Sequence, residues 1–117
     1  MNITSTQRNG FAAIVLEGDV DLSCSSALRK ELLERTFERC DIVVDLSRVG
    51  YIDSSGIAGL VEAYQGARAN GTRFILAAPS VPVLRVLRLA RLDRVFTIVE
   101  SVEPVPAVAA TPGESLL

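Results

Sequence analysis

Hydrophobic residues along the chain follow two spacings, one typical of strands and one typical of helices. Residues 2–8 alternate weakly around Ile3 and predict an edge strand, and residues 12–16 predict a second strand that ends at Glu17-Gly18. The dipeptide Asn9-Gly10 between them is a strong hairpin-turn signal. Residues 41–46 contain an unbroken β-branched run and predict a strand buried on both faces. Residues 73–77 predict a further buried strand, and residues 95–99 predict a short last strand.

Three amphipathic helices are predicted between these strands. The first covers residues 27–39 and places four large apolar side chains toward one side: Leu28, Leu32, Leu33 and Phe37. The second begins near Ser54 and ends near Ala69, before the stop signal Asn70-Gly71. The third follows Ser80 as its N-cap and carries three arginines on a face that we interpret as solvated: Arg85, Arg88 and Arg91.

This order of elements predicts an α/β fold, with a mixed, largely parallel sheet of about five strands and helices packed on it. The sheet would begin with one hairpin and continue through strand–helix crossovers. We expect one domain over residues 1–103. Residues 104–117 contain three prolines and a glycine and are expected to form a flexible C-terminal tail.

Composition excludes several classes of function. The chain of 117 residues has a formal net charge of −2, and its Lys and Arg residues are dispersed, so nucleic-acid binding has no electrostatic support. No apolar run reaches the ~20 residues that a membrane span needs, and no secretory signal is visible, so we expect no direct membrane insertion and a cytoplasmic location. We interpret Cys24 and Cys40 as free, at least half-buried thiols.

The absence of histidine restricts catalysis further. The chain has no histidine, so it can build neither a Ser-His-Asp triad nor a His-ligated metal site. A carboxylate-only site for a hard cation is the metal alternative that composition leaves open. An enzymatic site built on Asp53 and Ser54 would lack a base to activate the serine. We therefore expect no catalytic residues, no cofactor and no metal.

The stretch from Asp45 to Gly56 (DLSRVGYIDSSG) carries the most specific chemistry, because it joins a buried strand to a helix start. The first N–H groups of a helix are unpaired and partly positive, so a phosphate on Ser54 would meet the N–H groups of Ser55 and Gly56. Gly56 would let the backbone come close. Asp53 is adjacent, and Asp21 is expected nearby at the end of another strand. The simpler alternative is that this Asp-Ser-Ser-Gly sequence is only a helix cap.

These residues resemble a known family. The pattern Asp45-Leu46-Ser47-x-Val49-x-x-Ile52-Asp53-Ser54-Ser55-Gly56, preceded by Leu16-Glu17-Gly18-Asp19-Val20-Asp21, is similar to the STAS domain. Within that family it looks closest to the small bacterial anti-sigma factor antagonists. The similarity covers about residues 2–102 and includes the predicted order of strands and helices.

The resemblance implies a protein that switches partners and takes part in transcription regulation. Ser54, the first serine of the motif, would be phosphorylated by a serine kinase that is also the anti-sigma factor. The unphosphorylated chain would bind that kinase through Asp21, Asp53, Ser54, Ser55 and Gly56, and a PP2C-type phosphatase would reverse the modification. The ATP would belong to the kinase, so this chain would be substrate and ligand.

A second function is compatible with the same resemblance. Cytoplasmic STAS subunits of ABC-type phospholipid transport systems have a similar serine-bearing motif, and the runs at residues 56–63 and 89–93 are somewhat similar to theirs. Related domains usually end in a further helix on the sheet, which Pro104 and Pro106 would shorten or distort here.

Overall fold

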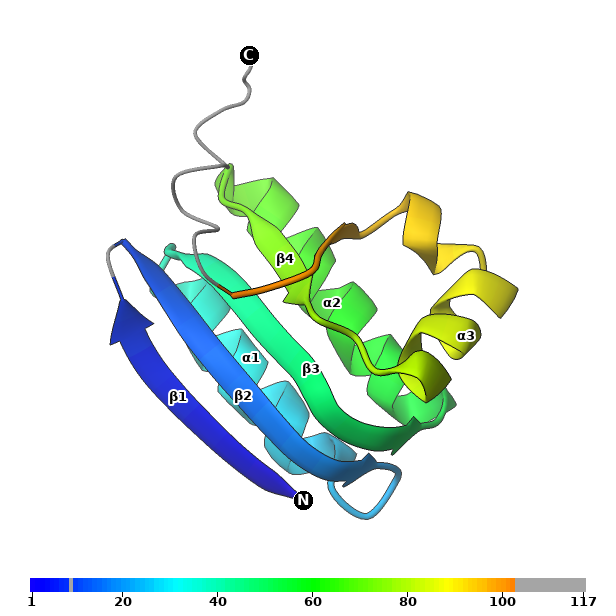
Figure 1. The fold of residues 1–117 in the computed structure, drawn as a ribbon. Helices are drawn as coiled ribbons and strands as arrows, with labels where there is room; N and C mark the ends of the chain where they lie inside the picture. The colour runs from blue at the N-terminus through cyan, green and yellow to red at the C-terminus, as the bar shows by residue number, and fades with distance from the viewer. Residues whose placement is uncertain (9, 103–117) are drawn as a thin grey trace.

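A five-stranded sheet with the spatial order β1-β2-β3-β4-β5 forms the centre of the protein (Figure 1). The computed structural model describes residues 1–8 and 10–102, so the predictions for Asn9 and for the tail 104–117 lie outside it. The strands are β1 (Asn2–Arg8), β2 (Phe11–Val20), β3 (Asp41–Ile52), β4 (Phe74–Ala77) and β5 (Thr97–Val99). β1 pairs antiparallel with β2, and all later pairs are parallel, which confirms the predicted mixed, largely parallel sheet.

Three helices alternate with the parallel strands: α1 (Ser25–Phe37), α2 (Ser54–Asn70) and α3 (Val81–Leu89). In Figure 1, α1 and α2 lie side by side behind the sheet, and α3 lies beside the carboxyl end of β3. Gly71 ends α2 in the left-handed conformation, with φ of 75°, as the Asn-Gly signal predicted. A short 3-10 helix, Leu92–Arg94, then leads into β5.

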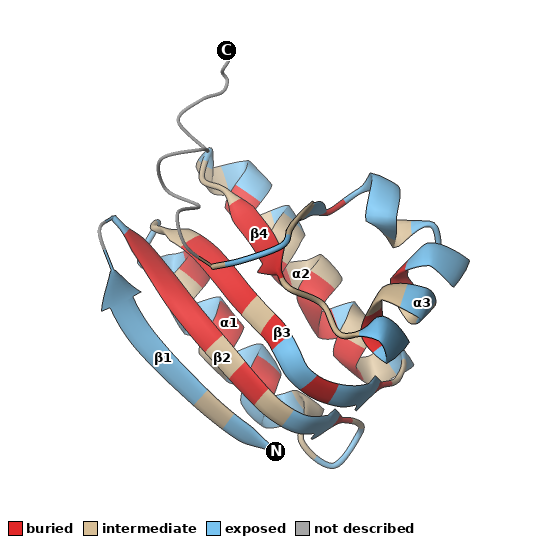
Figure 2. Ribbon diagram, viewed as in Figure 1, coloured by how far each residue is buried: buried red, intermediate tan, exposed pale blue. Residues whose placement is uncertain are grey.

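The core lies between the sheet and its helices. Leu28 and Leu32 of α1 and Leu60 of α2 are almost fully buried against inward-facing residues of β2 and β3. A smaller apolar cluster lies on the opposite face of the sheet and includes Phe11, Ala13, Val43, Ile75 and Ala77. The central strands are therefore buried on both faces, whereas edge strand β1 is almost entirely exposed (Figure 2).

Strand β3 is twice as long as the segment, residues 41–46, that predicted it. We expected the strand to end at Leu46, but it continues to Ile52 because β2 also continues and pairs with it up to Val20. The pairing shifts register twice, between Val15 and Glu17 and between Gly18 and Asp19 of β2, and each time β3 advances by one residue more than β2. Consequently residues 47–52 of the motif are held as a strand rather than as a loop.

The predicted inward positions of Leu33 and Phe37 are wrong. The side chain of Phe37 is 88% exposed, and that of Leu33 is 37% exposed. Residues four apart share a helix face, and the buried Leu28 and Leu32 are such a pair. Leu33 is rotated by about 100° from Leu32, and Phe37 follows Leu33 onto that outer face. Helix α1 thus has an apolar pair on each of two faces.

Among residues 1–8 and 10–102, no helix combines the length and the apolar content that crossing a bilayer requires.

Two substitutions in α1 test its two faces. Leu32→Ala should lower the free energy of unfolding by about 2–5 kcal/mol, because it leaves a cavity under the sheet. Phe37→Ala should change it by less than about 0.5 kcal/mol, because the ring stays in contact with water in the folded chain. Urea unfolding followed by circular dichroism measures both values. A large loss in Phe37→Ala would contradict the observed orientation of this side chain.

Candidate functional site

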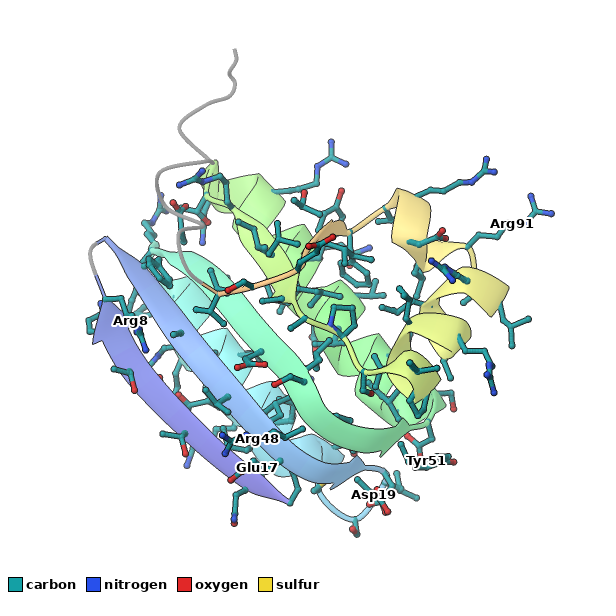
Figure 3. All side chains as sticks on the ribbon, viewed as in Figure 1. Arg8, Glu17, Asp19, Arg48, Tyr51 and Arg91 are labelled. Carbon is teal, nitrogen blue, oxygen red and sulfur yellow. The ribbon has the colours of Figure 1, made fainter. Side chains whose placement is uncertain are left out.

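The candidate site lies where β2 and β3 end and where α1 and α2 begin. At this end Asp19 of β2 pairs in register with Tyr51 of β3, and both lie close to the β2–α1 loop in Figure 3. The loop carries Asp21, and Ser54 opens α2 immediately after β3. Open α/β sheets place binding sites at such carboxyl ends of strands. The structure therefore brings the predicted site residues together at one end of the sheet.

Asp53 is the N-cap of α2, and its carboxylate organises the site. One oxygen, Oδ1, accepts hydrogen bonds from the N–H groups of Ser55 at 3.0 Å and Gly56 at 3.2 Å. The backbone N–H of Asp53 donates to the carbonyl of Val20 at 3.0 Å, which attaches the helix start to the end of β2. The hydroxyl of Ser55 and, to a smaller extent, backbone N–H groups lower the pKa of the Asp53 carboxyl.

The two adjacent serines have different environments. The hydroxyl of Ser55 donates to Asp53 Oδ1 at 2.6 Å and is half-buried. Ser54 is exposed as the first residue of α2, and no hydrogen bond of its hydroxyl occurs within the part of the chain that the structure describes. An incoming enzyme can therefore reach the hydroxyl of Ser54 more easily than that of Ser55. The expected exposure of Ser54 at a helix start is confirmed.

The expected phosphate contacts are not available in this structure. We predicted that a phosphate on Ser54 would meet the N–H groups of Ser55 and Gly56, but both already donate to Asp53. The next N–H, that of Ile57, donates to the carbonyl of Asp53. The side chain of an N-cap aspartate uses the same donors that a bound anion would use. A phosphate on Ser54 would consequently lie outside the cap and beside a carboxylate.

Asp21 lies close enough to Asp53 for the two charges to interact, as predicted. The hydroxyl and the backbone N–H of Ser23 donate to the carboxylate of Asp21, and these bonds lower its pKa, whereas the nearby Asp53 raises it. Two ionised carboxylates therefore flank the start of α2. Within the described residues, no group of three or more Asp, Glu, Cys or His side chains is placed to hold a metal ion.

Gly56 is required by close packing between α2 and the sheet. A Cβ at this position would lie 2.6 Å from Cγ1 of Val20 and 2.8 Å from Cγ1 of Ile52. Such distances are well inside van der Waals contact, so a larger residue must push the helix away from the strands. A Cβ at Gly59, one turn later, would meet no atom of a neighbouring element within 4 Å. Gly56 and Gly59 therefore face different surroundings.

Two exposed apolar residues at the site were not predicted from the sequence. Leu22 in the β2–α1 loop is 76% exposed, and Tyr51 in the extension of β3 is 51% exposed. Between α1 and α2 the surface has a hollow of about 150 Å³, lined in part by Ser26, Ser55 and Glu62, which is smaller than a usual ligand pocket.

A family profile for the STAS domain matches residues 2–104 of this sequence, nearly its whole length. The chain belongs to the STAS domain family. The match covers the described sheet, all three helices and the serine-bearing start of α2.

Solved structures with the same fold include several anti-sigma factor antagonists. One from Mycobacterium paratuberculosis is 21% identical, with a TM-score of 0.83, covering 92% of this chain and 93% of that chain. A STAS protein from Planctomyces limnophilus is 17% identical, with a TM-score of 0.82 and coverage of 93% and 98%. Phosphorylated SpoIIAA from Bacillus is 18% identical, with a TM-score of 0.74 and coverage of 94% and 100%. At these identities the similarity shows the fold.

The close approach at Gly56 predicts a contrast between two glycines of this STAS domain. Gly56→Ala should lower the free energy of unfolding by about 1–3 kcal/mol, because the methyl group overlaps Val20 and Ile52. Gly59→Ala is the matched control and should be neutral or stabilising by up to about 1 kcal/mol, since alanine favours the helix. Denaturant unfolding measures both. Equal effects at the two positions would contradict the packing argument.

The pKa of Asp53 predicts a specific pH dependence of stability. Because this pKa is lowered in the folded state, the ionised carboxylate stabilises the fold above the unfolded-state pKa of about 4. That contribution is lost as the pH falls through the folded-state pKa. Asp53→Asn keeps an N-cap side chain but cannot ionise. The difference in free energy of unfolding between wild type and Asp53→Asn should therefore shrink as the pH falls from 6 toward 2. Urea unfolding at each pH measures it. A difference that does not change with pH would contradict a stabilising role of the ionised Asp53 carboxylate.

Proposed function

We propose that this STAS domain is an anti-sigma factor antagonist that changes partners through phosphorylation of Ser54. Unphosphorylated, it binds a serine kinase that is also the anti-sigma factor, and it thereby frees the sigma factor. Phosphorylation of Ser54 ends this binding, and a PP2C-type phosphatase restores it. The observation that carries the proposal is the exposed hydroxyl of Ser54 at the start of α2, next to a serine whose hydroxyl is already hydrogen-bonded to Asp53.

Comparison with the solved structures supports this choice. Proteins named as anti-sigma factor antagonists share the fold over nearly their whole length, and SpoIIAA has been solved in unphosphorylated and phosphorylated forms. The kinase would supply the ATP, so this chain needs no cofactor of its own. We infer that it is a binding protein and a substrate rather than an enzyme.

The electrostatics of the site explain how one phosphate would end binding. A phosphoserine carries about −1.5 to −2 charges at neutral pH. At Ser54 this charge would add to those of Asp53 and Asp21, and the first-turn N–H groups would not neutralise it because Asp53 already accepts them. Opposite a carboxylate of the partner, this added charge would cost several kcal/mol, as like charges brought together at an interface do. The partner would therefore be released without any refolding of the STAS domain.

The surroundings of Ser54 suit a protein partner. Leu22 and Tyr51 are exposed apolar residues beside it, and aromatic residues are enriched in protein interfaces. We propose that Asp21 and Asp53 lie within the surface that the kinase covers, while Ser55 and Gly56 keep the start of α2 in place. Ser80 holds the beginning of α3 against β3 through a hydrogen bond from its hydroxyl to the carbonyl of Val49, which keeps the same end of the sheet rigid.

Substitutions at Ser54 should separate the two states. In pull-downs from the source cell extract, Ser54→Ala should retain a kinase-type ATPase, because it cannot be phosphorylated. Ser54→Asp should weaken this binding by about tenfold or more, because the added charge copies part of the effect of phosphate. Mass spectrometry identifies the partners and the phosphorylated residue, which should be Ser54.

Two controls make this experiment specific. The Ser55→Ala variant should still be phosphorylated at Ser54, because the hydroxyl of Ser55 belongs to the helix cap and is not the group that the kinase modifies. Thr6→Asp adds the same charge to an exposed position on β1 and should leave the partners unchanged. Identical partners for Ser54→Ala and Ser54→Asp would overturn the proposal. Recovery of ABC transporter subunits instead of a kinase would favour the role in phospholipid transport.

A further inference from the structure

The small hollow between α1 and α2 lies beside the start of α2. Its volume is about 150 Å³, and its lining includes Ser55 of the cap together with Ala58 and Gly59 one turn later. A Cβ at Gly59 would meet no heavy atom of a neighbouring element within 4 Å, so α2 leaves this space without a side chain. A volume of about 150 Å³ accommodates a group of the size of benzene. The hollow therefore has room for one side chain.

An ion pair joins the two helices at one end of this hollow. Nε and Nη2 of Arg29 on α1 donate to the two carboxylate oxygens of Glu62 on α2, at 2.6 and 2.9 Å. Both residues line the hollow, and Ser26 and Ser55 line its other end. A bidentate pair of this kind fixes the relative orientation of its two planar groups. The hollow is therefore already formed in the unbound chain.

Polar side chains around the hollow already have hydrogen-bond partners. The hydroxyl of Ser55 donates to Asp53 at 2.6 Å, and that of Ser25 donates to the carbonyl of Leu22 at 3.3 Å. The two members of the ion pair satisfy each other. A polar occupant would have to compete with these bonds, whereas an apolar occupant gains by leaving water. The lining therefore favours an apolar side chain.

The hollow is continuous with the surface around Ser54. Residues four apart lie on the same face of a helix, so Ala58 follows Ser54 along the exposed side of α2. Ala58 also lines the hollow. Ser55 connects the two regions from the other side, because it lines the hollow and bonds to the cap carboxylate. A protein that covers the hydroxyl of Ser54 therefore also reaches the mouth of the hollow.

We propose that this hollow receives one apolar side chain of the kinase that binds the Ser54 site. The inference rests on the proposed function and adds a second contact to that interface. The side chain is of leucine to phenylalanine size, and it becomes buried between α1 and α2, as the anchor residues of interfaces are. The hollow thus supplies affinity, and the charge at Ser54 decides whether the kinase can reach it.

Filling the hollow tests the proposal. The Gly59→Leu variant should fold, because the space is open and leucine favours a helix over glycine. Its new side chain would take the place of the kinase residue and should weaken binding at least tenfold. The kinase that mass spectrometry identifies in the Ser54→Ala pull-down is purified for this measurement. Isothermal titration calorimetry without ATP gives each dissociation constant.

Ala69→Leu is the matched control. It places the same side chain at an exposed position of the same helix, about 15 Å further along, and should leave the affinity unchanged. Circular dichroism checks that both leucine variants fold.

A double-mutant cycle identifies the occupant of the hollow. A diazirine-bearing amino acid in place of Ser26 should crosslink to one segment of the kinase, which mass spectrometry locates. Truncating the apolar residue of that segment to alanine should weaken binding to wild type at least tenfold. The same truncation should weaken binding to Gly59→Leu less than about twofold, because that contact is already lost.

The outcomes separate this proposal from the proposed function. If Gly59→Leu binds the kinase as tightly as wild type does, or if the losses in the cycle are additive, the proposal is overturned, while loss of the kinase by Ser54→Asp still supports the proposed function. If Gly59→Leu keeps the kinase but converts a wild-type dimer to monomer in sedimentation velocity, a second copy occupies the hollow and the proposal is likewise overturned. If Ser54→Ala binds no kinase, both fail.

Discussion

One carboxylate, that of Asp53, determines how the two halves of the site fit together. The carboxylate oxygen Oδ1 accepts hydrogen bonds from the first turn of α2, and the backbone N–H of Asp53 donates to the carbonyl of Val20 at the end of β2. A backbone hydrogen bond from Leu22 also reaches this carboxylate, which attaches the β2–α1 loop. The start of α2 is therefore connected to the end of β2 and to the start of the following loop by a single residue. Without it, three segments of the chain would lose their common contact.

The same interaction decides what each neighbouring residue can do. Ser55 serves the cap, Gly56 permits contact with Val20 and Ile52, and Ser54 remains on the surface. Because the cap already satisfies the first N–H groups, added negative charge at Ser54 cannot be absorbed by the fold. A rigid site with an excess of negative charge controls association through electrostatics, whereas a flexible site would adapt to the new charge.

Helix α1 has two apolar faces in different surroundings. Its inner pair, Leu28 and Leu32, contributes to the core, and its outer pair, Leu33 and Phe37, remains exposed at the end of the sheet opposite Ser54. Large exposed aromatic side chains are more typical of interfaces than of solvated helix faces.

The order of strands and helices, the mixed sheet and the stop at Gly71 followed from the sequence alone, because hydrophobic spacing and turn chemistry are local properties. The clustering of Asp21, Asp53 and Ser54 also followed, since parallel strands end on the same edge. Three features required the tertiary structure. The extension of β3 to Ile52 depends on pairing with β2, the use of first-turn N–H groups by Asp53 depends on the cap geometry, and the exposure of Phe37 depends on which face of α1 meets the sheet. Each of these is set by contacts between residues distant in the chain or by competition for one donor, which spacing along a sequence does not encode.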